Sequence, residues 1–185
     1  MRTLGVRDFC GLLLLLTVAA AAGCAFSRPA VPESGAAPDQ EMVLADRSYS
    51  LQNVPPDASP QRTASFRIAA EGQRAFGQGR YQEAEDRFEK ALSIDARNAF
   101  CYLYLADIRF KERDPQQALM LLEQSEVLFY GHPYWLSEVY TKKGVCLEEL
   151  QAQEDAVRSY RKALEYNPWN DKARKGLQRI EGSDG

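Results

Sequence analysis

The strongest constraint on the fold of this chain is the run YQEAEDRFEKALSIDARN, from Tyr81 to Asn98. It places Ala84, Phe88 and Ala91 on one face of a helix, because residues three and four apart lie above one another there. Two small residues beside one ring allow a second helix to pack closely against that face. The sequence therefore predicts closely packed helices in tandem. The same spacing returns twice, at Ala118, Leu122 and Ser125 and at Ala156, Tyr160 and Ala163.

The three runs are separated by 34 and 38 residues, and a period of about 34 residues built from helix pairs is typical of tetratricopeptide (TPR) repeats. The chain resembles a TPR protein over about two thirds of its length. The resemblance implies an all-α fold, a TPR-type superhelix of helical hairpins (an α-solenoid), over residues 59–182. Three repeats are about the minimum that buries enough surface to be stable. The expected parts are repeats at 65–98, 99–132 and 137–170, a capping helix at 171–180 and a tail at 183–185.

The N-terminus has the features of a secretory signal peptide over residues 1–23. Arg2 and Arg7 precede an apolar run from Gly11 to Ala22, and small residues follow. A charged start, a short apolar core and a small-residue end are typical of such signals. The apolar run is too short to cross a hydrocarbon layer of about 30 Å as a stable anchor.

The end of this segment, Ala21 to Cys24, resembles the lipobox of bacterial lipoproteins, with Ala21 where that family prefers Leu. The resemblance implies that Cys24 is acylated, with palmitate among the usual chains, and becomes the first mature residue. Several acyl chains on one residue give a permanent membrane anchor. Ala25, rather than Asp, follows the cysteine, which by the same resemblance favours the outer membrane of a bacterial envelope, facing the periplasm. The alternative is a conventional secretory signal that is cleaved nearby.

Residues 24–58 are predicted to be a disordered tether between this anchor and the repeats. The segment is polar and shows no helical period, so it cannot bury enough apolar surface to fold alone. An alternative is that its apolar spots, Met42–Leu44 and Tyr49–Leu51, dock transiently in the groove of the array. Its prolines are Pro29, Pro32, Pro38, Pro55 and Pro56.

Two cysteines remain in the mature chain, Cys101 and Cys146. Their places in the repeat differ by about two helical turns, or roughly 10 Å along a helix axis. That separation is too large for a disulfide bond. We therefore predict two buried free thiols.

Composition argues against several function classes. The only histidine is His132, so two-histidine metal motifs and histidine dyads are excluded. The net charge of −3 does not suit a nucleic-acid binder, which needs surplus Lys and Arg. Gly77 and Gly79 fall where a repeat turns and not in a phosphate loop. We predict no catalytic residue, metal, cofactor or small-molecule substrate.

The TPR resemblance implies that the first helix of each repeat lines a concave groove for a protein or peptide ligand. Phenylalanines at one end and carboxylates at the other predict a partner segment that is apolar first and basic after. A clamp for a terminal carboxylate is not expected, because the matching positions mostly lack Lys, Asn and Arg. Alternatively, Phe66 and Phe110 pack between helices or under the tether. The predicted groove residues are Phe66, Gln73, Phe76, Phe100, Leu103, Asp107, Phe110, Glu138 and Glu148.

Four extra residues, Pro133 to Leu136, separate the second and third repeats and bring Tyr130, Tyr134 and Trp135 into one cluster. Such a cluster is either a local core or an interface. The sequence as a whole predicts a non-catalytic, membrane-anchored adaptor in envelope assembly, for pili or secretins, the outer membrane or the cell wall. A structural subunit that self-associates through the cluster is the alternative, and an enzyme is a remote one.

Overall fold

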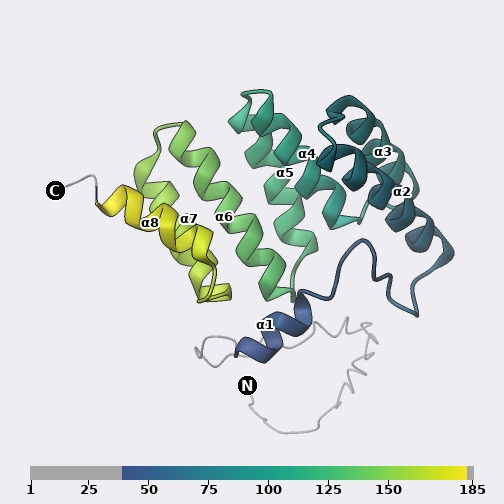
Figure 1. The fold of residues 1–185 in the computed structure, drawn as a ribbon, viewed down its shortest axis with the longest axis horizontal. Helices are drawn as coiled ribbons and strands as arrows, with labels where there is room; N and C mark the ends of the chain where they lie inside the picture. Colours follow the sequence, from purple (N-terminus) through teal and green to yellow (C-terminus); the bar gives the residue numbers. More distant parts are fainter. Residues whose placement is uncertain (1–38, 183–185) are drawn as a thin grey trace, which may run out of the picture. The chain divides into compact units, whose positions relative to one another are not determined.

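The computed structural model describes residues 39–182, which form eight α-helices and no β-strand (Figure 1). The signal segment 1–23, Cys24, residues 25–38 and the tail 183–185 lie outside the described residues. The helices are α1 (Gln40–Asp46), α2 (Pro60–Gly77), α3 (Tyr81–Ile94), α4 (Ala99–Lys111), α5 (Pro115–Leu128), α6 (Pro133–Glu149), α7 (Gln153–Tyr166) and α8 (Asp171–Glu181).

The helices pair as hairpins α2–α3, α4–α5 and α6–α7, and α8 follows against α7 and α6 (Figure 1). Successive hairpins pack side by side in chain order. This arrangement confirms the predicted all-α TPR-type fold. No helix in the described part of the chain is long and apolar enough to cross a membrane.

The repeated pattern of a small, a large and a small residue forms the contact surface inside each hairpin. All nine of its side chains, from Ala84 to Ala163, have no exposed surface. The glycines of the first helices make this contact possible. A Cβ added at Gly72 would lie 2.9 Å from Phe88, and one added at Gly144 would lie 2.6 Å from Tyr160. Only glycine leaves enough room for these rings at the observed helix separation.

A buried hydroxyl-to-carbonyl hydrogen bond joins the two helices of every repeat. Ser65 donates to the carbonyl of Ala91 over 2.9 Å, and Asn98 then donates to the Ser65 hydroxyl over 2.9 Å. The third repeat copies this with Ser137, Ala163 and Asn170. In the second repeat the serine and the alanine exchange places, and Ser125 donates to the carbonyl of Ala99 over 3.2 Å.

Residues 39–58, which we call the strap, pack against the repeats, with α1 beside the N-terminal end of α6 (Figure 1). This differs from the expected disordered tether. Val43 and Leu51 are only 3% exposed, and Leu51 belongs to the main hydrophobic core. The strap folds because the repeats supply the apolar surface that it cannot bury by itself.

Candidate peptide-binding groove

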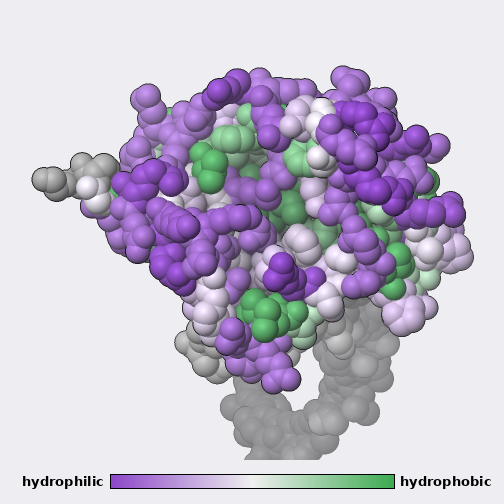
Figure 2. Space-filling model, viewed as in Figure 1, coloured by the Kyte–Doolittle hydropathy of each residue, from purple (hydrophilic) through white to green (hydrophobic). Residues whose placement is uncertain are grey.

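A groove of about 440 Å³ opens between α4, α6 and α8. Its apolar lining includes Phe110 on α4 and Val145 and Cys146 on α6. Val145 is 37% exposed although it is apolar. Figure 2 shows hydrophobic surface in the middle of this face, surrounded by hydrophilic side chains. We call this feature the C-terminal groove.

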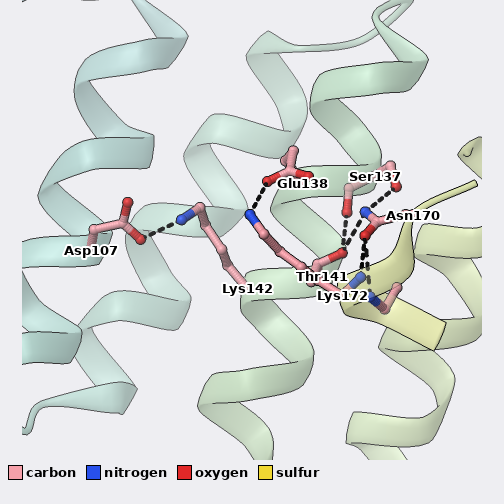
Figure 3. A network of polar contacts seen from close by, with 8 residues as sticks. Asp107, Ser137, Glu138, Thr141, Lys142, Asn170 and Lys172 are labelled. Carbon is pink, nitrogen blue, oxygen red and sulfur yellow. Dashed lines mark hydrogen bonds and ion pairs between the residues drawn. The ribbon is translucent and has the colours of Figure 1, made fainter. Parts of the chain in front are cut away.

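Ion pairs cross the C-terminal groove and join its walls (Figure 3). Lys142 on α6 reaches Asp107 on α4, with 2.6 Å between Nζ and Oδ1. Lys172 on α8 lies 3.5 Å from Glu138 on α6. Two of the carboxylates predicted for partner binding are therefore already paired with cations of the same chain.

Asn170 fixes the start of α8 against α6 (Figure 3). Its amide nitrogen donates to Ser137 over 2.8 Å and to Thr141 over 3.0 Å. Its oxygen accepts from the backbone N–H groups of Lys172 and Ala173, each over 3.1 Å. This residue therefore caps α8 and bonds to α6 at once, so the groove wall formed by α8 has a fixed position.

Glu148 is the third predicted carboxylate, and it too is paired. Arg179 on α8 donates to both of its oxygens, over 2.6 and 2.9 Å, and the Tyr160 hydroxyl also donates to it. Burial alone would raise the pKa of Glu148, but the hydrogen bonds from Arg179 and Tyr160 hold it below its ordinary value. The groove thus has three carboxylates and four cations. The pairs are Asp107 with Lys142, Glu138 with Lys172 and Glu148 with Arg179. The fourth cation is Lys175, and no carboxylate of the described residues pairs with it.

Two of the predicted groove phenylalanines are core residues here, which corrects their assignment to the groove surface. Phe66 is 0% and Phe100 is 1% exposed, with their rings 5.8 Å apart at a steep angle. Tyr49 of the strap covers both, at 6.1 and 5.3 Å between ring centroids. The alternative considered for Phe66, packing under the N-terminal segment, is the arrangement found.

The other predicted groove residues divide between the two ends of the array. Gln73 donates to the Tyr104 hydroxyl and accepts from Gln52 of the strap. Phe76 is half-buried, 5.6 Å from the ring of Tyr104. Leu103 is buried. Of the nine residues, only Asp107, Phe110 and Glu138 line the C-terminal groove directly.

The three residues of the predicted aromatic cluster, Tyr130, Tyr134 and Trp135, do not share one exposed patch. Trp135 packs on Phe100 and Phe129, at 4.9 and 5.5 Å between centroids. Tyr134 lies edge-on to Trp135, whereas Tyr130 is 51% exposed. The local-core interpretation therefore describes Trp135, whereas self-association through the exposed Tyr130 stays a prediction.

Sequence reasoning missed the basic wall of the groove. Lys172, Lys175 and Arg179 fit the polar side of an amphipathic capping helix, and that pattern does not distinguish solvent from groove. It also missed the contact between the strap and the end of the second repeat, where Asp46 lies 2.6 Å from Nδ1 of His132. A signal for the latter exists, because repeats one and three end in Asn98 and Asn170 and the second ends in His132.

Cys101 and Cys146 are free and buried, as predicted. Burial raises the pKa of both thiols, that of Cys146 to about 12. Neither thiol is a nucleophile at neutral pH, since the thiolate is the reactive form. In the described residues no three His, Cys, Asp or Glu side chains group closely enough to hold a metal ion.

The described residues form a scaffold of helical hairpins with an open groove between α4, α6 and α8. Two models of the tetratricopeptide repeat family match the chain, at residues 75–129 and 137–168. The chain therefore carries tetratricopeptide repeats in both halves of the array.

Solved TPR domains have the same fold. The first TPR domain of Spaghetti (RPAP3), bound to the HSP90 peptide SRMEEVD, has a TM-score of 0.59 at 24% identity, over 70% of this chain and 98% of that one. The Arabidopsis OM64 TPR domain has a TM-score of 0.60 at 20% identity, over 66% and 98%. The first TPR domain of human RPAP3 has a TM-score of 0.58 at 25% identity, over 64% and 91%.

Proposed function

We propose that this protein is a membrane-anchored TPR scaffold that binds a segment of a partner protein in the C-terminal groove. The observation that carries the proposal is an open groove with an exposed apolar residue, Val145, between walls fixed by ion pairs. RPAP3 domains of the same fold are solved with HSP90 and HSP70 peptides, which supports a peptide or protein as partner here.

The partner segment has one apolar side chain for the groove floor and acidic residues for the α8 wall. The basic half predicted from sequence loses its support, because Asp107, Glu138 and Glu148 are neutralised within the chain. Lys175 is the cation left over. An incoming carboxylate gains from this surplus charge most at low ionic strength.

We also propose the cellular setting from the sequence. The signal features of residues 1–23 and the lipobox-like Ala21–Cys24 favour a lipid anchor at Cys24, in a bacterial envelope and on the periplasmic side of the outer membrane. In that setting the partner belongs to envelope assembly, such as pilus or secretin, outer-membrane or cell-wall machinery.

Photo-crosslinking in cells tests the groove. A photoreactive amino acid in place of Val145 should capture a defined partner, and Lys175→Glu should reduce that capture severalfold. The matched control places the same amino acid at Val127 on α5, which is 73% exposed and outside the groove. Capture of the same protein from Val127, or none from Val145, would contradict the proposal.

A further inference from the structure

The carboxylate of Asp46 in the strap binds to His132 and to the backbone at the start of α6. One oxygen of Asp46 lies 2.6 Å from Nδ1 of His132, and the other accepts from the backbone N–H of Tyr134 over 2.9 Å. The Asp46 side chain is only 10% exposed. Tyr134 lies in the first turn of α6, where backbone N–H groups are unpaired and favour an anion.

Three residues further on, Tyr49 fills an aromatic site. Its ring stacks on His132 at 4.3 Å and also contacts Phe66 and Phe100. Its hydroxyl accepts from Arg62 over 3.1 Å. The indole of Trp135 donates to its backbone carbonyl over 2.7 Å.

Leu51 completes the set in the main hydrophobic core. The strap residues Asp46, Tyr49 and Leu51 thus form the pattern Asp-x-x-Tyr-x-Leu, in which each named side chain has its own contacts. A short segment held by a charged group, a ring and an aliphatic side chain is bound as linear peptide motifs are.

The array departs from its own repeat pattern where this segment binds. Asn98 and Asn170 each bond to the first serine of their repeat. In the second repeat Ala99 stands in place of that serine and His132 in place of that asparagine, so His132 is available to Asp46. The extra residues 133–136 follow at once and supply Trp135.

We propose that this surface is a receptor for peptide segments of the pattern Asp-x-x-Tyr-x-Leu and that residues 46–51 occupy it in cis. A partner segment with the same pattern displaces the strap and takes its place. Displacement uncovers Phe66, Phe100 and Gln73, three of the residues that the sequence predicts to bind a partner. The inference rests on the proposed function only in requiring that a partner segment exists.

Binding of a peptide from the chain itself tests the receptor. The probe is a fluorescein-labelled peptide of residues 44–54, LADRSYSLQNV, measured by anisotropy against the purified full chain. A tethered ligand competes at an effective concentration near the millimolar range. The wild type should therefore bind the probe weakly, and the double variant Asp46→Asn, Tyr49→Ala should bind it about tenfold or more tightly.

The matched control is the same peptide with its Asp and Tyr replaced by Asn and Ala, which should not bind. His132→Ala, added to the double variant, should remove binding of the unaltered probe. The double variant retains the Leu51 side chain, which fills its core site until the probe displaces it, and circular dichroism checks the helicity of the variant. A folded double variant that binds both peptides equally, or binds neither, overturns the proposal.

If the double variant loses its helices, hydrogen exchange of the wild type decides. Excess probe peptide should speed exchange of the amides of residues 46–52, and unchanged exchange overturns the proposal. Photo-crosslinking from Val145 reports on the C-terminal groove alone. Its outcome therefore separates failure of this inference from failure of the proposed function.

Discussion

Gly144 and Gly176 both contact the ring of Tyr160, one from α6 and the other from α8. A Cβ added at Gly176 would lie 2.4 Å from Cζ of that ring, closer than real atoms approach. The ring cannot move away freely, because its hydroxyl donates to Glu148 and its side chain is fully buried. Helix packing here depends on the absence of two methyl groups.

Gly176→Ala should therefore destabilise the array despite the better helix propensity of alanine. Overpacking costs about 1–3 kcal/mol, whereas the propensity gain is at most about 1 kcal/mol. The expected net loss is about 1 kcal/mol, measured by urea unfolding. Gly77→Ala is the control, since its added Cβ would meet no atom within 4 Å apart from its chain neighbours and its own helix backbone, and it should be neutral or stabilising. Equal stability of Gly176→Ala and wild type would refute this packing argument.

The exchange of serine and alanine in the second repeat shows how single residues compensate for each other. Ser65 and Ser137 donate from the first helix, whereas Ser125 donates from the second. Each repeat keeps one buried hydroxyl on the opposite carbonyl, and a buried donor without a partner would cost stability. The repeats therefore preserve the bond rather than the residue that makes it.

At the scale of elements, α8 is both a cap and a wall. Ala173 and Ile180 of its apolar face are buried, as a terminal helix requires if the last repeat is not to expose its core. The side of α8 next to this face brings Arg179 to Glu148 and Lys172 to Glu138. The element that ends the solenoid therefore also completes the C-terminal groove.

Glu148→Gln should loosen α8 and change the acid unfolding of the protein. Burial raises the pKa of Glu148, but the hydrogen bonds from Arg179 and Tyr160 together with the charge of Arg179 lower it by more than burial raises it. The pKa of Glu148 is therefore lower in the folded chain than in the unfolded chain. The stabilisation it gives is present above the unfolded pKa of about 4.3 and is lost as pH falls through the folded pKa.

The variant should therefore lose about 1 kcal/mol at pH 7 and differ less from the wild type at pH 3 in urea unfolding. The expected loss is small because the Arg179 side chain is 59% exposed, so water screens its interaction with Glu148. Glu154→Gln is the control, since its side chain is 96% exposed and 3.9 Å from Arg158. A stability difference that stays constant between the two pH values would contradict the assigned role of Glu148.

At the scale of the described molecule, the strap links helices that lie far apart along the sequence. It contacts α2 through Phe66, α4 through Phe100 and α6 through Trp135. In a solenoid each repeat otherwise contacts only its neighbours. The strap should make α2, α4 and α6, the first helices of the three repeats, unfold together. Release of the strap should weaken that coupling.

The two buried thiols report on this coupling. Cys101 on α4 and Cys146 on α6 belong to the same hydrophobic core as Leu51 of the strap. Burial raises the pKa of Cys146 to about 12 and that of Cys101 too, so at pH 8 both remain protonated. Because the thiols hold their protons more strongly in the folded chain, the folded state is favoured by this difference at pH values below the unfolded thiol pKa of about 8.5. The advantage is lost as pH rises towards the pKa values of the folded chain.

Both thiols should react with an alkylating reagent at pH 8 only after unfolding, and at the same urea concentration. Mass spectrometry of labelled peptides measures this, and reduction of the purified protein should add no hydrogens. The control is the urea-unfolded chain, in which both thiols react at once. Early reaction of one thiol alone would show that the two helices unfold separately.

The sequence by itself determined the helix pairs, their period and their contact surface. Ala84, Phe88 and Ala91 predict a helix face that Gly72 must meet, because helical periodicity and residue size act locally. Every member of that pattern is buried as expected. The free thiols followed from the same periodicity, since the repeat fixes positions along each helix axis.

Only the tertiary structure decided which part of the array surface is open. Asp46 meets His132 across 86 residues of sequence, so no local pattern marks the strap as folded. The groove carboxylates also pair with cations of other helices, and sequence spacing does not show these partners. Burial and charge pairing depend on which distant residues the fold brings together, and that is the physical reason why the solenoid was predictable and its open groove was not.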